Sequence, residues 1–189
     1  MQFETVPRVF AQTVQAYGDQ VAMRHKDLGL WHDITWNGYY RQASYVGCAL
    51  IEMGLSRGDC VALIGDNCPE WVMADMGIQC AGGVAVGVYA TNAWQQVAYV
   101  INDAEARFFF VENEEQLDKW LRFRDEAPAL EKIIVWDTEG LRQFKDPMVM
   151  TFEKLLDLGR QVAEKQAHLF EERMQTCLLY TSPSPRDPR

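Results

Sequence analysis

The spacing of hydrophobic residues changes near residue 55. Before that point, helical spacing and alternation occupy separate segments: 5–17 and 35–53 have helical spacing, and 20–26 and 30–36 alternate. Alternating runs joined by a short turn with glycine, here Asp27-Leu28-Gly29, are typical of a β-hairpin. We therefore predict a helix, a β-hairpin and a second helix that Thr35 caps and Gly54 ends.

Short apolar runs alternate with helical segments in the rest of the chain. The apolar runs begin near residues 60, 84, 107 and 132, and helical spacing follows at 68–82, 92–104, 113–130 and 151–170. Strands that alternate with helices in this way build βαβ units and a parallel sheet that is covered on both faces. The predicted fold class is α/β, with a mainly parallel sheet that follows the first helix and the hairpin.

The composition changes at Cys177. A helix cannot continue through Pro183, Pro185 and Pro188, which crowd the end of the chain. We therefore divide the chain into residues 1–176, which form the sheet domain, and residues 177–189, a proline-rich tail.

Charge and cysteine usage narrow the classes of partner and compartment. The net charge of −9 disfavours a broad surface for nucleic acid or anionic lipid, but it is compatible with a local basic pocket for a small anion. The cysteines contain no C-x-x-C pair, which is typical of free thiols in a reducing compartment; they are Cys48, Cys60, Cys68, Cys80 and Cys177. We find no signal-peptide pattern and no apolar run of membrane-spanning length, and we expect a cytoplasmic protein.

The turn 65–71 is the first candidate for chemistry, because ligands of open parallel sheets bind at the carboxyl ends of the strands. Asn67 and the N-terminus of the following helix could hold an anion there. The alternative, which we favour, is that Asn67 only caps the helix and Trp71 belongs to the core. The segment has no G-x-G-x-x-G dinucleotide motif.

Other conspicuous residues have structural interpretations. The glycines of 81–87 surround a strand and suit close packing, and the acidic residues of 112–120 suit a solvated helix start. We predict that four aromatic residues of the helices lie in the core: Trp71, Trp94, Tyr99 and Trp120. His25 and His32 lie on the hairpin without a neighbouring nucleophile, so no catalytic pair is nominated.

Four segments in order carry a resemblance to a known family. They are YGDQVAMRHKDLGLWHDITW (17–36), LSRGDCVALIGDNCPEW (55–71), AGGVAVGVYATNAWQQVAYVINDAEARFFFVEN (81–113) and FEKLLDLGRQVAE (152–164). The second is similar to the pattern G-D-x-V-A-I-x-x-x-N-x-x-E-W. Together they resemble the N-terminal region of the AMP-forming acyl-CoA synthetases, nearest to the bacterial long-chain fatty acid–CoA ligases of the adenylate-forming superfamily.

The resemblance implies a chemistry and a larger domain. Members of this family activate a fatty acid or another carboxylic acid with ATP and Mg²⁺, release pyrophosphate, and transfer the acyl group from the adenylate to the thiol of coenzyme A. Their phosphate loop reads Y-T-S-G-T-T-G-x-P-K-G, and a later Glu, a ribose-binding Asp and a Lys on a mobile C-terminal domain complete the site. The resemblance also implies peripheral membrane contact and a homodimer. The net charge and the short apolar runs predict no nucleic-acid partner and no transmembrane segment.

The tail matches the phosphate loop over three letters. Thr181 and Ser182, with the tyrosine before them, agree with its start, but Pro183 replaces the first glycine, Pro185 a threonine, and Arg186 the second glycine. Proline fixes φ and lacks an N–H group, so this stretch cannot form the same cradle of amides. We interpret the match as coincidental and the tail as foreign sequence, such as an adapter or assembly remnant.

We therefore expect an N-terminal fragment of an acyl-CoA ligase that has no catalytic, cofactor-binding or metal-binding residue of its own and is inactive alone. It should expose apolar surface and an unpaired strand edge. Two alternatives stay open. One is a non-catalytic α/β interaction domain with a proline-rich docking tail. The other is an adenylate-forming enzyme that acts on a different acid, such as an aryl-acid ligase or a luciferase-like oxidase.

Overall fold

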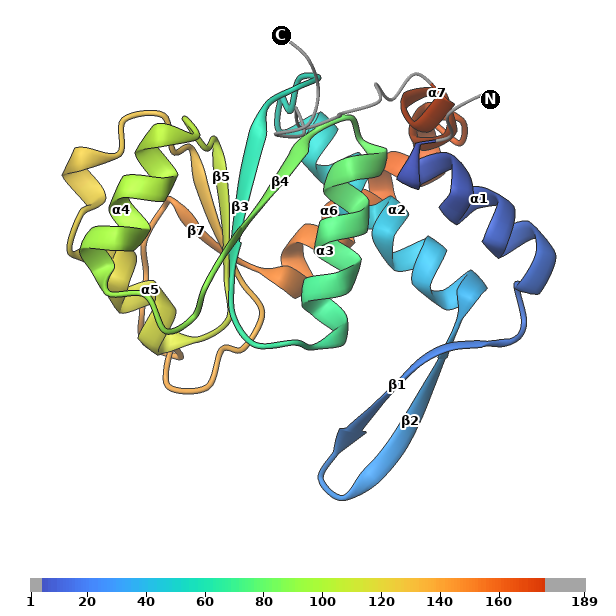
Figure 1. Cartoon of the computed structure of the whole chain (residues 1–189), viewed down its shortest axis with the longest axis horizontal. Helices are drawn as coiled ribbons and strands as arrows, with labels where there is room; N and C mark the ends of the chain where they lie inside the picture. Colours follow the sequence, from blue (N-terminus) through green and yellow to red (C-terminus); the bar gives the residue numbers. More distant parts are fainter. Residues whose placement is uncertain (1–4, 176–189) are drawn as a thin grey trace, which may run out of the picture.

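The computed structural model describes residues 5–175, which form one parallel sheet between two helical layers and a projecting hairpin (Figure 1). The helices are α1 (Val6–Tyr17), α2 (Trp36–Glu52), α3 (Pro69–Cys80), α4 (Trp94–Asp103), α5 (Glu114–Leu121), the 3₁₀ helix η1 (Arg124–Glu126), α6 (Phe152–Lys165) and α7 (Leu169–Gln175). The strands are β1 (Val21–Asp27), β2 (Leu30–Thr35), β3 (Cys60–Ile64), β4 (Val84–Val88), β5 (Phe108–Val111), β6 (Lys132–Val135) and β7 (Val149–Thr151). The predicted α/β class is confirmed.

The hairpin of β1 and β2 forms a separate two-stranded antiparallel sheet. Its turn places Leu28 at φ 45° and Gly29 at φ 85°, the pair of positive φ values that a tight two-residue hairpin turn requires. Figure 1 shows the hairpin extending away from the sheet domain, attached at the N-terminus of α2. Thr35 caps α2 as predicted, because its Oγ1 accepts a hydrogen bond of 3.1 Å from the Gly38 amide.

The main sheet has the strand order β4-β3-β5-β6-β7, and all its neighbouring strands are parallel. Its central strands are buried on both faces, which explains their unbroken apolar runs. Val61 and Phe108 point to the face covered by α2, α3 and α6, whereas Ala62 and Phe109 point to the face covered by α4 and α5 (Figure 1). The four predicted strand starts are confirmed, and β7 is an additional strand.

Helix α2 is the centre of one layer and packs against α3 and α6. At its crossing with α6, a Cβ on Gly159 would lie 1.8 Å from the carbonyl oxygen of Tyr45, so only glycine permits this approach. Phe170 of α7 packs edge-on against Tyr40 of α2, with ring centroids 5.6 Å apart. Two predicted helices are therefore wrong in extent: 151–170 is divided between α6 and α7, and 113–130 ends as α5 at Leu121 before η1.

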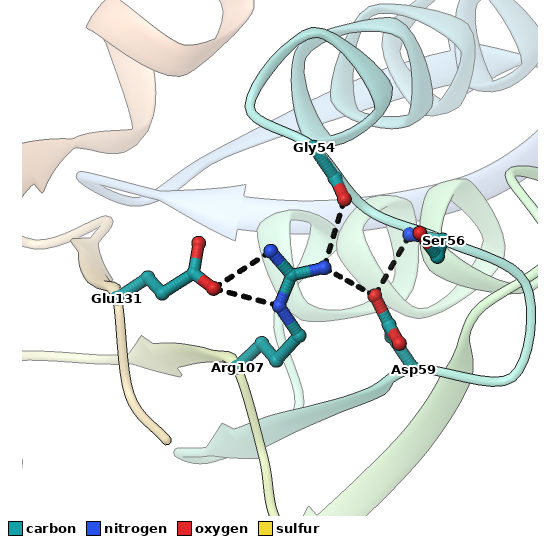
Figure 2. A network of polar contacts seen from close by, with 5 residues as sticks. All are labelled: Gly54, Ser56, Asp59, Arg107 and Glu131. Carbon is teal, nitrogen blue, oxygen red and sulfur yellow. Dashed lines mark hydrogen bonds and ion pairs between the residues drawn. The ribbon is translucent and has the colours of Figure 1, made fainter. Parts of the chain in front are cut away.

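The amino ends of the strands are tied together by Arg107, the residue before β5 (Figure 2). Its guanidinium donates 2.8 Å hydrogen bonds to the Gly54 carbonyl and to Glu131, and it forms an ion pair with Asp59. Asp59 in turn accepts a 2.8 Å hydrogen bond from the Ser56 amide. One cation therefore connects the α2–β3 loop to the start of β6, and these contacts raise the Arg107 pKa above its ordinary value.

No helix within residues 5–175 combines the length and the apolar character that crossing a bilayer requires. The predicted boundary between residues 1–176 and 177–189 lies outside the described residues, as do Thr181 and Ser182.

Candidate functional site

The carboxyl ends of the strands form a row along one edge of the sheet. Strand register aligns Ile64 with Val88 and Val111, and Val111 with Val135, so the residues that follow these strands become neighbours. In an open α/β sheet this is the edge at which ligands bind. The turn 65–71, singled out from the sequence, begins here.

A carboxylate accepts a hydrogen bond from the backbone of that turn. Glu112, which follows β5, accepts a 2.8 Å hydrogen bond from the Asp66 amide, while its own amide donates to the Ile64 carbonyl at 3.0 Å. A Cβ on Gly65 would lie 2.5 Å from the Trp136 ring, so the backbone of Gly65 packs closely against that side chain. The Asp66 amide already has a partner, and that partner is an anion.

The predicted cap by Asn67 is wrong. Helix α3 begins at Pro69, its N-cap residue is Cys68, and no side chain caps it by a hydrogen bond. Proline at the first helical position places the boundary one residue later than we predicted. Asn67 is exposed, and Trp71 is partly buried against the core, which is the structural role that we favoured for it.

The electrostatics of this turn oppose an anionic ligand. Burial raises the pKa of the Cys68 thiol to about 12; the Trp71 amide acts in the opposite direction, and the Glu70 and Glu112 carboxylates add to the rise. Glu70 also occupies the first turn of α3. With carboxylates on both sides and the Asp66 amide engaged, the turn offers little to a phosphate group.

The other residues singled out from the sequence are dispersed. Trp120 is fully buried and Trp94 is partly buried, but Tyr99 is 69% exposed, so its predicted core position is wrong. The buried side of the short helix α4 consists of Val97, Ala98 and Ile101, and Tyr99 points away from it. His25 and His32 stack across the hairpin with ring centroids 5.2 Å apart. The hairpin is a separate two-stranded sheet, so neither histidine belongs to the carboxyl edge of the main sheet.

Metal ligands do not cluster in the described part of the chain. No group of three or more His, Cys, Asp or Glu side chains in residues 5–175 could hold a metal ion. Cys48, Cys60 and Cys68 are free thiols. Burial raises the Cys48 pKa to about 11, so this thiol stays protonated at neutral pH.

A cavity of about 650 Å³ lies at the same edge, between the ends of β6 and β7 and the loop that connects them. Its lining consists of Val135, Thr138, Leu141, Arg142, Phe144, Lys145, Asp146, Pro147, Val149, Met150, Thr151 and Lys154. Sequence reasoning missed it. The signal was the concentration of basic residues between 142 and 154 in a chain of net charge −9.

Three contacts fix the loop around this cavity. Arg124 of η1 forms an ion pair with Asp146, which also accepts a 2.8 Å hydrogen bond from the Met148 amide. Lys132 donates a 2.6 Å hydrogen bond to the Pro147 carbonyl. Two cations that do not line the cavity, Arg124 and Lys132, therefore hold its wall in place.

Comparison with known proteins gives a consistent assignment. The family model for the AMP-binding enzymes matches residues 10–184. Long-chain-fatty-acid–CoA ligase ACSBG2 of Xenopus laevis is 35% identical over 189 residues, which is 98% of this chain and 25% of that protein. ACSBG1 of Bos taurus is 30% identical over 190 residues, again 98% of this chain and 26% of that protein.

Solved structures show the same fold. The anthranilate CoA ligase AuaEII, in complex with anthranoyl-AMP, aligns with a TM-score of 0.72 and 22% identity over 83% of this chain and 28% of its own. The A-PCP didomain of the carboxylic acid reductase from Segniliparus rugosus aligns with a TM-score of 0.71 and 14% identity over 85% of this chain and 27% of its own. The chain spans about a quarter of the length of the curated relatives that it matches. With the family model matching most of its residues, the chain belongs to the AMP-binding enzyme family.

Proposed function

We propose that this chain is the N-terminal part of an AMP-forming ligase that joins long-chain fatty acids to coenzyme A. The observation that carries the proposal is the match of residues 10–184 to the AMP-binding enzymes, together with long-chain fatty acid–CoA ligases among the relatives over 98% of the chain. In the reaction, the fatty acid carboxylate attacks the α-phosphate of ATP, which gives acyl-adenylate and pyrophosphate. The thiol of CoA then displaces AMP and forms the thioester.

The described residues serve this reaction as a scaffold. The carboxyl-edge turn does not fit a nucleotide phosphate, because Glu112 holds the Asp66 amide and Glu70 adds a further negative charge. Residues 5–175 also lack a cluster that could bind Mg²⁺. In this proposal, later segments of the whole protein supply the ATP and Mg²⁺ contacts and carry the chemistry.

The proposal extends to the compartment of the protein, its contact with membranes and its oligomeric state. The free thiols of Cys48, Cys60 and Cys68 fit a reducing compartment such as the cytoplasm. A long-chain acid partitions into lipid, so an enzyme that acts on it gains from contact with a membrane surface. A homodimer belongs to the same proposal.

The test is to read the genomic DNA across the codons for Glu172 to Arg189 and onward. We expect a frame that continues into a Gly/Thr/Ser-rich loop followed by lysine. Its full product should form palmitoyl-CoA, AMP and pyrophosphate only when ATP, Mg²⁺, CoA and palmitate are all present, while the 189-residue chain should form none. A natural stop codon directly after Arg189, or a full product that activates benzoate and not palmitate, would contradict the proposal.

A further inference from the structure

The cavity at the ends of β6 and β7 carries unbalanced positive charge. Arg142, Lys145 and Lys154 line it, and none of the three forms an ion pair with any residue of 5–175. Asp146 is the one carboxylate in the lining, and its charge is compensated by Arg124. In a chain with a net charge of −9, three exposed cations that line one hollow and form no ion pair within residues 5–175 favour an anion.

The position of Lys154 strengthens this argument. It lies in the first turn of α6, where the helix dipole is positive and a cation is unfavourable. Its amide donates a 3.2 Å hydrogen bond to the Thr151 hydroxyl, which fixes the start of the helix beside the cavity. Glu153, its neighbour in the same turn, does not line the cavity. An anion in the cavity would interact favourably with both the lysine and the helix terminus.

The remaining lining is mostly apolar and includes Val135, Leu141, Phe144, Val149 and Met150. Apolar walls with a few polar groups, and a volume of about 650 Å³, are typical of sites for small organic ligands. Three cations suit a ligand with more than one negative charge, such as a phosphomonoester, which carries about −1.5 to −2 at neutral pH. Arginine and lysine are the side chains that commonly bind phosphate.

We propose that this cavity binds an organic phosphomonoester, with the phosphate held by Arg142, Lys145 and Lys154 and the organic part against the apolar walls. The site is separate from the turn 65–71 and does not depend on the proposed ligase activity. The phosphomonoester could belong to a soluble metabolite or to a lipid headgroup, because both present the same group to the cations.

Titration calorimetry of the 189-residue chain with 4-nitrophenyl phosphate tests the proposal. We expect saturable binding that is tighter than that of inorganic phosphate, which lacks the apolar part, and tighter than that of 4-nitrobenzyl alcohol, which lacks the charge. Raising NaCl should weaken the binding. Equal affinity for the neutral alcohol, or no binding of either phosphate, would overturn it.

Lys154→Met should reduce the affinity for 4-nitrophenyl phosphate about tenfold, as expected for the loss of a charged hydrogen-bond donor. Lys165→Met is the matched control, since it removes an exposed lysine from the last turn of the same helix, outside the cavity. Thermal unfolding without ligand should show no loss of stability for Lys154→Met, because its charge opposes the helix dipole. Identical affinities of the two variants would refute the assignment. Co-flotation with phosphatidate vesicles that Lys154→Met abolishes would identify a lipid as the source, and binding of the free ester alone would identify a soluble metabolite.

Discussion

Replacing Gly159 with alanine tests whether the close crossing of α2 and α6 sets the stability of that helical layer. The new Cβ atom would lie 1.8 Å from the carbonyl oxygen of Tyr45 and 2.5 Å from its carbonyl carbon. Both are backbone atoms within α2, so no change of rotamer makes room for the methyl group. The helices would have to separate by roughly 1.5 Å to restore an ordinary van der Waals contact.

The magnitude follows from two opposing terms. Overpacking of a close-packed contact costs about 1–3 kcal/mol, and a clash with backbone belongs at the upper end. Alanine recovers about 1 kcal/mol relative to glycine within a helix. We therefore expect Gly159→Ala to lower the free energy of unfolding by about 2 kcal/mol, which corresponds to a decrease in Tm of about 4–8 °C for a domain of this size.

Urea unfolding followed by tryptophan fluorescence provides the measurement, with Gly38→Ala as the matched control. A Cβ on Gly38, in the first turn of α2, would lie 3.4 Å from Thr35 Oγ1 and 3.6 Å from Ile34, distances that the structure accommodates. The control should be as stable as the unmodified chain or slightly more stable. If Gly159→Ala matched the control in both midpoint and m value, the helices would not cross as closely as described, and the reasoning would fail.

Three further predictions concern charged groups and thiols. Arg107→Lys should lower the free energy of unfolding by about 1–2 kcal/mol, because an ammonium cannot replace a guanidinium that contacts two carboxylates and a carbonyl; an unchanged urea midpoint would contradict this. Burial raises the Asp75 pKa in the folded chain above its value in the unfolded chain. The contribution of Asp75 to the free energy of unfolding is therefore fully present below the ordinary Asp pKa, and it is lost as the pH rises through the raised pKa. Asp75→Asn should therefore raise Tm at pH 7 but not at pH 3, and an equal gain at both pH values would refute that cause. In a Cys177→Ser chain, iodoacetamide at pH 8 should label Cys48 and Cys68 slowly, since burial raises their pKa values to about 11 and about 12. Urea should accelerate the labelling. If mass spectrometry found equal labelling rates with and without urea, the burial of these two thiols would be contradicted.

The features that the sequence predicted well depend on local patterns. The starts of β3, β4, β5 and β6 follow from short apolar runs, and in the central strands β3, β5 and β6 burial on both faces accounts for these runs. The hairpin follows from alternation and from Gly29, whose positive φ the turn requires. These signals need no knowledge of distant residues.

The features that were missed depend on long-range contacts. Strand β7 is three residues long and is defined by its pairing with β6, so it carries no recognisable period. The break between α6 and α7 has neither glycine nor proline at its centre; the packing of Phe170 against α2 accompanies it. The cavity was missed for the same reason, since its walls come from β6, β7 and the loop between them, which become neighbours only when the two strands pair.

The two edges of the sheet use their charged residues differently. At the amino edge, Arg107 and its carboxylate partners satisfy one another, and little remains for a ligand. At the carboxyl edge, Glu112 closes one turn, whereas the cations around the neighbouring cavity have no partner among the described residues. This difference predicts a separation of effects. Arg107→Lys should reduce stability and leave the binding of 4-nitrophenyl phosphate unchanged, whereas Lys154→Met should reduce that binding and leave stability unchanged. Variants that altered both properties together would show that the two edges are not energetically independent.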